Sequence, residues 1–293
     1  MDLRNFPFVK MNGLGNDFVM IDARAEPVGP SATAAGAIAN RTSGVGCDQV
    51  IVLEPSRTAD VFMRILNADG SEVGTCGNAS RCVAALLQAG LGRNRISIET
   101  RAGTLYARIS DDGRVTVDMG APRFASDEIP LARAATDTRA IDLTFTLPDG
   151  RVLAEPSAVN VGNPHCIFWV RDAESYDLAA FGAELEHHWL FPERANISLA
   201  EVADDRTIKL RVWERGTGIT RACGTAACAA AVCAARTGRT DRKVDVQLPG
   251  GVLAIEWRGD DDHILMTGPA EFEFAGIIRL NGSGTTVEVA RHS

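Results

Sequence analysis

The chain carries one unit twice, and this internal repeat restricts its fold more than any other feature. The segment TCGNASRCVAALLQAG at 75–90 is similar to ACGTAACAAAVCAARTG at 222–238, and their Cys-Gly pairs are 147 positions apart. The same spacing links three further pairs: Asn16 with Asn163, Gln49 with Asn196, and Asn67 with Glu214. Downstream the spacing becomes 148 in four pairs: Gly90 with Gly238, Gly103 with Gly251, Gly120 with Gly268, and Phe124 with Phe272. A spacing kept over this length indicates two copies of one folding unit, with one inserted residue.

The two copies predict two pseudo-symmetric domains. A chain of 293 residues is also long for a single compact core. We expect an N-terminal domain of residues 1–121 plus 271–293 and a C-terminal domain of residues 122–270.

The pattern within each copy predicts one helix followed by strands. In the first copy the helix is expected to end at Gly90, with strands at 96–100, 104–110 and 114–119. In the second copy the helix is expected to end at Gly238, with strands at 244–248 and 252–257. The second helix, AACAAAVCAA, is apolar on every side, which is typical of a helix enclosed within a domain. The predicted class is α+β, in which each domain is a mostly antiparallel sheet wrapped around a central apolar helix.

Composition and charge restrict the classes of function. Hydrophobic residues make up 45% and charged residues 23% of the chain, as in folded globular proteins. The formal net charge of -8 offers no basic surface to a phosphate backbone, so no nucleic-acid partner is expected. The opening MDLRNFPFVK has no signal-peptide pattern, and no stretch approaches 18 consecutive apolar residues. We therefore expect a cytoplasmic protein without membrane association.

Two of the seven cysteines point to chemistry. The set is odd and lacks a short CxxC pair, which argues against disulfides and against a metal site. A single cysteine is usually a small buried apolar residue. Cys76 and Cys223, however, occupy the same repeat position at the start of an apolar helix. The first turn of a helix carries unpartnered N–H groups and partial positive charge, which lower the pKa of a thiol from about 8.5.

Two such cysteines on opposite faces of one carbon would invert it, because one thiolate removes a proton and one thiol returns a proton. The glycine after each cysteine would let helix N–H groups approach a carboxylate beside that carbon and stabilise the developing charge. The chain has three lysines, Lys10, Lys209 and Lys243, which we interpret as strand-flanking or surface residues rather than a pyridoxal-phosphate lysine. The pattern predicts an epimerase that needs no cofactor and no metal.

Seven segments also carry a resemblance to a known family: NGLGNDFVMID at 12–22, GVGCDQ at 44–49, NADGSEVGTCGN at 67–78, GNPH at 162–165, PERAN at 192–196, ERGTG at 214–218 and ACGT at 222–225. In this order, from about residue 8 to residue 280, the chain resembles the diaminopimelate epimerase family. The resemblance implies two domains of sheet around a helix, with the last strand returning to the first domain. It implies the interconversion of LL- and meso-2,6-diaminopimelate, on the route to lysine and peptidoglycan. The implied partner is this small molecule, and a homodimer is left open.

The resemblance also implies a role for each matching residue. Cys76 and Cys223 match the proton-transfer cysteines, and His165 and Glu214 match groups beside the thiols, with Glu214 also placed to meet the substrate ammonium. The turns that hold the α-carboxylate match Gly77, Asn78, Gly224 and Thr225. The clamp on the distal end matches Asn67, Asn163, Asn196 and Arg215, and the remaining pocket residues match Asn16 and Gln49.

Two alternative functions are compatible with the same scaffold. A racemase of the same fold acting on another amino acid, such as histidine, would keep the cysteines but change the distal clamp, which is present here. A non-catalytic amino-acid-binding protein on the same scaffold would not need both cysteines, and both are present.

Overall fold

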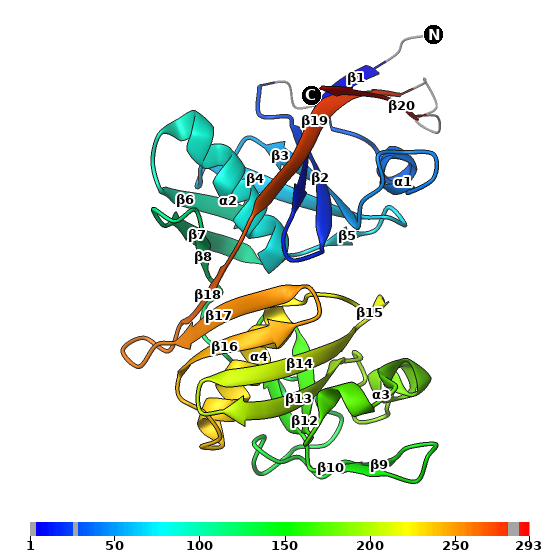
Figure 1. The fold of residues 1–293 in the computed structure, drawn as a ribbon, viewed down its shortest axis with the longest axis vertical. Coiled ribbons are helices and arrows are strands. Elements are labelled where there is room, and N and C mark those ends of the chain that lie inside the picture. Colours follow the sequence, from blue (N-terminus) through cyan, green and yellow to red (C-terminus); the bar gives the residue numbers. More distant parts are fainter. Residues whose placement is uncertain (1–3, 26–28, 281–286, 293) are drawn as a thin grey trace. The chain divides into compact units, whose positions relative to one another are not determined.

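The structure is a computed structural model that describes residues 4–25, 29–280 and 287–292. The chain forms two compact units (Figure 1). Unit 1 contains the residues up to Val117 and those from Gly268 onward, and unit 2 is Asp118–Thr267. The sequence-based boundaries at 121/122 and 270/271 lie a few residues beyond these crossings. The observed crossings fall at the ends of two strands.

Unit 1 contains strands and two helices: β1 (Arg4–Asn12), β2 (Asp17–Asp22), α1 (Ala32–Ala39), β3 (Gln49–Glu54), β4 (Val61–Asn67), β5 (Glu72–Val73), α2 (Gly77–Leu91), β6 (Arg95–Thr100), β7 (Gly103–Ile109), β8 (Val115–Asp118), β19 (Glu271–Leu280) and β20 (Val287–His292). Strand β1 pairs antiparallel with both β2 and β19, and β19 pairs with β20. The end of the chain therefore returns to unit 1, as the resemblance implied.

Unit 2 contains β9 (Thr144–Thr146), β10 (Val152–Ala154), β11 (Ser157–Asn160), β12 (Pro164–Trp169), η1 (Ala173–Ser175), η2 (Leu178–Ala180), α3 (Gly182–Glu186), β13 (Asn196–Asp204), β14 (Thr207–Glu214), β15 (Gly218–Ile219), α4 (Gly224–Arg236), β16 (Lys243–Leu248), β17 (Gly251–Trp257) and β18 (Ile264–Gly268). The predicted strands at 96–100, 104–110, 114–119, 244–248 and 252–257 are confirmed as β6, β7, β8, β16 and β17.

Strand register repeats between the units. The parallel pair β2 and β3 aligns Phe18 with Gln49, and the parallel pair β12 and β13 aligns His165 with Asn196, 147 positions later. The parallel pair β4 and β6 aligns Val61 with Ile98, and β14 and β16 align Ile208 with Val246. The repeat inferred from the sequence is thus a repeat of structure. Each unit is mostly antiparallel but contains two parallel pairs that strand signals could not reveal.

The apolar helix of unit 2 is enclosed by sheet. Every residue of α4 from Gly224 to Ala234 is buried, and the helix packs against β11, β12, β13, β14, β16 and β17 (Figure 1). Small alanine side chains let these strands approach the helix closely. Helix α2 is buried from Gly77 to Ala84, packs against β6 and β7, and is exposed at its end, where Leu91 is 41% accessible. Enclosure of the helix is therefore complete in unit 2 and partial in unit 1.

One helix end differs from the prediction. Helix α2 continues through Gly90 to Leu91, and Gly92 is the C-cap in the left-handed region, with φ of 64°. In unit 2, Gly238 has φ of 67° after α4 ends. Gly90 and Gly238 match in sequence, yet in unit 1 the helix-ending role has moved two residues along to Gly92.

Each unit also contains a second helical segment that the sequence analysis did not expect. These segments are α1 in unit 1 and η2 with α3 in unit 2, and they follow the spacing of 147. The Ser31 hydroxyl caps α1 by accepting the N–H of Ala34 at 3.2 Å. Ala35 and Ile38 of α1 join the core of unit 1, and Leu185 of α3 joins a core in unit 2. Tertiary burial therefore stabilises segments too short to be stable helices alone.

No helix in the described part of the chain combines the length and apolar character needed to span a membrane.

Candidate active site

Cys76 and Cys223 occupy the same structural position, one in each unit. Each is the N-cap of its helix with an extended backbone, φ of -150° for Cys76 and -130° for Cys223. The first backbone hydrogen bonds run from Ser80 to the Cys76 carbonyl at 2.9 Å and from Ala227 to the Cys223 carbonyl at 3.1 Å. The N–H groups before these donors have no acceptor four residues back within the helix. Both sulfurs thus lie where partial positive charge favours an anion.

We group the predicted site residues by unit into two half-sites, which are described separately. The first half-site, in unit 1, consists of Asn16, Gln49, Asn67, Cys76, Gly77 and Asn78. The second half-site, in unit 2, consists of Asn163, His165, Asn196, Glu214, Arg215, Cys223, Gly224 and Thr225. Together they contain every site residue predicted from the sequence.

In the first half-site, Asn16 contacts both Cys76 and Asn78. The Asn16 Oδ1 lies 4.0 Å from the Cys76 sulfur and accepts a hydrogen bond from Asn78 Nδ2 at 3.4 Å. Asn78 is held in turn by Arg81, whose Nη1 donates to Asn78 Oδ1 at 3.0 Å and whose Nε donates to the Pro269 carbonyl at 3.1 Å. Arg81 is fully buried. The predicted carboxylate-binding turn is therefore braced by a buried cation that the sequence analysis did not single out.

Gln49 and Asn67 lie opposite each other on β3 and β4. Gln49 Nε2 donates to Asn67 Oδ1 at 2.9 Å, and Asn67 Nδ2 donates to the Ser71 hydroxyl at 3.0 Å. Asn67 also starts a turn, because its carbonyl accepts the N–H of Gly70. The Gln49 Oε1 is buried and has no hydrogen-bond partner among the described residues. A ligand donor would satisfy this oxygen.

The second half-site surrounds Cys223 with groups that favour its neutral thiol. Burial raises the pKa of Cys223 well above its ordinary value, and the nearby Glu214 carboxylate raises it further. The Thr225 hydroxyl, 3.5 Å from the sulfur, and the Ala226 N–H act in the opposite direction but more weakly. Glu214 also accepts a hydrogen bond from the Thr220 hydroxyl. Cys76 is half-buried, whereas the other six cysteines are buried.

His165 is a neutral ring that holds Asn163. Its Nε2 lies 2.8 Å from Asn163 Oδ1, and the ring is fully buried. Burial, together with the positive charge of Arg215, lowers the pKa of His165 to about 3. A neutral imidazole has one donor nitrogen, so Nε2–H donates to Asn163 and Nδ1 is left as a buried acceptor without a partner among the described residues. His165 therefore acts here by position rather than as an imidazolium.

Asn196 and Arg215 form one assembly. The Asn196 side chain is buried, donates to the Pro164 carbonyl at 3.0 Å and accepts the backbone N–H of Arg215 at 3.0 Å. The exposed Arg215 side chain donates one hydrogen bond, from Nη1 to the Glu193 carbonyl at 2.9 Å. Because a guanidinium has five N–H donors, this anchored side chain can still engage a carboxylate.

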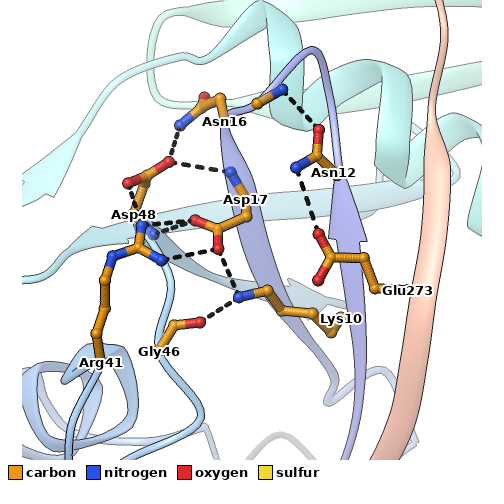
Figure 2. A network of polar contacts seen from close by, with 9 residues as sticks. Lys10, Asn12, Asn16, Asp17, Arg41, Gly46, Asp48 and Glu273 are labelled. Atoms are coloured by element: carbon orange, nitrogen blue, oxygen red, sulfur yellow. Dashed lines mark hydrogen bonds and ion pairs between the residues drawn. The ribbon is translucent and has the colours of Figure 1, made fainter. Parts of the chain in front are cut away.

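A cluster of charges behind Asn16 was missed from the sequence (Figure 2). It consists of Lys10, Asp17, Arg41 and Asp48. The interpretation of Lys10 as a strand-flanking or surface residue is wrong: Lys10 is 4% exposed within β1 and donates to Asp17 Oδ2 at 2.6 Å and to the Gly46 carbonyl. The sequence did contain a feature that could have indicated this cluster. Asp17 directly follows Asn16, and Asp48 directly precedes Gln49, in two of the family segments.

Comparisons with known proteins find relatives along most of the chain. The sequence profile of a family described as diaminopimelate epimerase matches residues 8–125 and 157–273. A diaminopimelate epimerase from Rhodopseudomonas palustris (strain TIE-1) is 52% identical over 277 residues, covering 94% of this chain and 94% of that protein. One from Rhodospirillum centenum is 54% identical over 272 residues, covering 92% and 91%. A solved hydroxyproline epimerase from Agrobacterium vitis has a TM-score of 0.69 at 15% identity, covers 98% of this chain and 95% of that one, and shows similarity of fold alone.

Proposed function

Because the chain belongs to the diaminopimelate epimerase family, we propose that it interconverts LL- and meso-2,6-diaminopimelate without a cofactor, as a step in making lysine and peptidoglycan precursors. The enzyme is an isomerase. The observation that carries the proposal is the pair of cysteines at matching N-caps of the two repeated helices.

The chemistry follows from the two half-sites. In one direction, the Cys76 thiolate removes the α-proton from one face of the carbon, and the Cys223 thiol delivers its own proton to the other face. Afterwards Cys76 holds a thiol and Cys223 a thiolate, and the reverse direction exchanges these roles. Negative charge that develops towards the α-carboxylate is stabilised by the first-turn N–H groups of Gly77, Asn78, Gly224 and Thr225.

Selectivity for a long substrate with a second amino-acid group depends on the distal clamp. We assign the distal carboxylate to Arg215, whose guanidinium can donate two parallel hydrogen bonds. Asn67, Asn163 and Asn196 complete the clamp, Asn196 by holding the Arg215 backbone. Asn16 and Gln49 line the remaining part of the first half-site, and Glu214 is assigned to the substrate ammonium. A racemase for a shorter amino acid would not use Arg215 in this way.

A cytoplasmic location, expected from the sequence pattern, and a homodimer, which the resemblance leaves open, complete the proposal. Fractionation of cells and light scattering of the purified protein, respectively, test these two parts.

The decisive experiment incubates the protein with LL-diaminopimelate in deuterated water without added cofactor. We expect meso-diaminopimelate with deuterium at the inverted carbon, because the returned proton comes from a thiol that exchanges with solvent. Histidine and proline, tested in parallel, should show no deuterium uptake. Uptake into histidine alone would favour the racemase with another substrate, and tight binding of diaminopimelate without exchange would favour a binding protein.

The same experiment tests the cysteine pair. We expect Cys76→Ala and Cys223→Ala each to abolish epimerisation while circular dichroism remains unchanged, because neither thiol serves both faces of the carbon. Cys166→Ala, at a buried cysteine within β12, is the matched control and should keep activity. Near-normal turnover by a folded Cys76 or Cys223 variant would refute the two-base mechanism.

A further inference from the structure

We propose that Asp48 is a positioning residue for this reaction: its carboxylate fixes the side-chain amide of Asn16 so that the Asn16 carbonyl faces the Cys76 sulfur. The inference rests on the proposed function for its link to catalysis, but its geometry concerns unit 1 alone.

The orientation of Asn16 follows from the chemistry of its neighbour. Asn16 Nδ2 lies 2.7 Å from Asp48 Oδ2 (Figure 2). A carboxylate can only accept hydrogen bonds, so the NH₂ end of the amide must face Asp48. The carbonyl end then faces the other way, where Asn16 Oδ1 lies 4.0 Å from the Cys76 sulfur and 3.4 Å from Asn78 Nδ2. Asp48 makes the shorter of the two hydrogen bonds that decide which end of Asn16 the thiol meets; the longer one comes from Asn78 Nδ2, which Arg81 holds in place.

Asp48 is itself fixed in place by charge and by the backbone. Arg41 Nη2 donates to Asp48 Oδ1 at 2.7 Å and to Asp17 Oδ1 at 2.9 Å. The two aspartates also accept each other's backbone N–H at 3.0 Å, which ties the start of β2 to the loop before β3. Burial alone would raise the pKa of Asp17, but hydrogen bonds and charges from Arg41 and Lys10 lower it to about 2. Asp17 therefore stays charged throughout the neutral range.

The second copy of the repeat has no carboxylate at the matching position. The position that matches Asp48 is Ala195, a buried alanine just before β13. Unit 2 holds its own asparagine differently, because Asn163 Oδ1 is bound by His165 Nε2. The matching residue of His165 in unit 1 is Phe18. Each unit thus fixes one pocket asparagine, but through different partners, which is expected when the two cysteines need different environments.

The orientation has a defined effect on the thiol. A carbonyl that accepts the S–H of Cys76 favours the thiol and aims its proton, whereas an NH₂ group in the same place would favour the thiolate. If Asp48 is replaced by a side chain that does not force the amide, only the longer contact from Asn78 Nδ2, at 3.4 Å, holds this orientation, and Asn16 can turn over. The pKa of Cys76 then falls, and proton return from Cys76 becomes slower.

The experiment measures the pKa of Cys76 directly, from the pH dependence of its alkylation by iodoacetamide, with peptides resolved by mass spectrometry. The proteins are the unchanged enzyme, Asp48→Asn, Asn16→Ala and the double variant. We expect Asp48→Asn to lower the pKa of Cys76 by about 1 pH unit and to lower kcat about tenfold with little change in KM. In the Asn16→Ala background, Asp48→Asn should have no further effect, because the residue acts through Asn16.

The double variant separates this proposal from its rival. Removing the Asp48 charge would also lower the pKa of a nearby thiol through space, and that effect would persist without Asn16. Equal pKa changes in both backgrounds, or no change in the pKa of Cys76, would overturn the proposal. Alkylation needs no diaminopimelate, so an enzyme inactive on that substrate would contradict the proposed function and leave this measurement readable.

Two further variants serve as controls. Asp22→Asn lies at the other end of β2, and its carboxylate contacts Arg24 rather than Asn16. It should leave both the pKa of Cys76 and kcat unchanged. If Asp48→Asn fails to fold, Asp48→Ala replaces it, because alanine is already the residue at the matching position 195. Retention of the normal pKa of Cys76 by folded Asp48→Ala would equally overturn the proposal.

Discussion

Arg215 is held by two hydrogen bonds, which leave most of its guanidinium N–H donors available to a ligand. Its backbone N–H is held by Asn196 and its Nη1 by the Glu193 carbonyl. The guanidinium is thus oriented in advance, which lowers the entropy lost when it binds a carboxylate. A lysine at this position has the charge but not the planar pair of donors.

We therefore predict that Arg215→Lys raises KM for diaminopimelate roughly 10- to 100-fold, the loss expected for a hydrogen-bonded charge pair of about 1.5–3 kcal/mol. Steady-state kinetics with both stereoisomers measure it. Arg194→Lys is the matched control, because Arg194 is exposed and its contact is an ion pair with Glu186 at 3.7 Å. Unchanged KM in Arg215→Lys would remove this residue from the clamp.

His165 gives a prediction about stability and pH. Its folded pKa is about 3, well below the value of 6.5 in the unfolded chain. Between these values the unfolded state binds a proton that the folded state does not, so stability is lost as pH falls through 6.5. The loss should be about 2 kcal/mol between pH 7 and pH 5, and it should disappear in His165→Gln, whose amide can still donate to Asn163. Urea unfolding of both proteins at these two pH values tests this, and parallel pH profiles would contradict it.

At the scale of elements, the end of α2 provides a pair of opposite predictions. Gly92 has φ of 64°, where an alanine is strained, so Gly92→Ala should destabilise the protein by about 1 kcal/mol. Gly90 lies inside the helix, and a Cβ added there would meet no atom within 4 Å. Gly90→Ala should therefore stabilise by about 0.5–1 kcal/mol. Chemical denaturation measures both, and effects of the same sign would show that the helix ends elsewhere.

The sequence could predict elements whose pattern is local. Alternating residues identified β6, β7, β16 and β17, and continuous alanine identified the enclosed helix α4. The parallel pairing of β2 with β3 could not be predicted, because it joins strands that are separated by α1 and depends on the whole unit. The helix α1 was missed for the same reason, since its burial against the core supports a segment of only 8 residues.

For the site, too, local sequence patterns could be predicted, whereas contacts that depend on the fold could not. The repeat was sufficient to identify the two N-cap cysteines, and the motifs supplied the residues around them. Lys10 was misjudged because a lysine within a strand usually reaches solvent, and only the fold shows that it meets Asp17 in the interior. Asp48 was missed because its partner Asn16 lies 32 positions away. Adjacency to Asn16 and Gln49 drew attention to these two segments, but it did not show that Asp48 meets Asn16.

At the scale of the whole molecule, the two units share the backbone arrangement that positions each cysteine, but they differ in the side chains around each sulfur. Both keep the Cys-Gly N-cap and the strand registers, but Cys76 is half-buried beside Asn16 while Cys223 is buried near Glu214. A two-base reaction benefits from this difference, because the two sulfurs hold opposite protonation states at each stage of the reaction. The repeat therefore supplies symmetric placement, and substitutions within it supply the chemical asymmetry.

The final prediction concerns oxidation and follows from what a two-base reaction requires. Each sulfur must come within about 3–3.5 Å of one carbon, which sets the two sulfurs roughly 6–7 Å apart across the substrate. A disulfide needs about 2.05 Å, so the units would have to shift by several ångströms, and the chain crosses between them at 117/118 and 267/268.

We predict that dilute hydrogen peroxide inactivates the enzyme by linking Cys76 to Cys223. The more accessible Cys76 thiolate attacks peroxide and becomes a sulfenic acid with release of hydroxide, and the Cys223 thiol then displaces water from it to form the disulfide. A thiol reductant should restore activity, and bound substrate should protect. Peptide mapping after alkylation decides the question: if both residues remain alkylatable in the inactivated protein, the two sulfurs do not meet and the link is refuted.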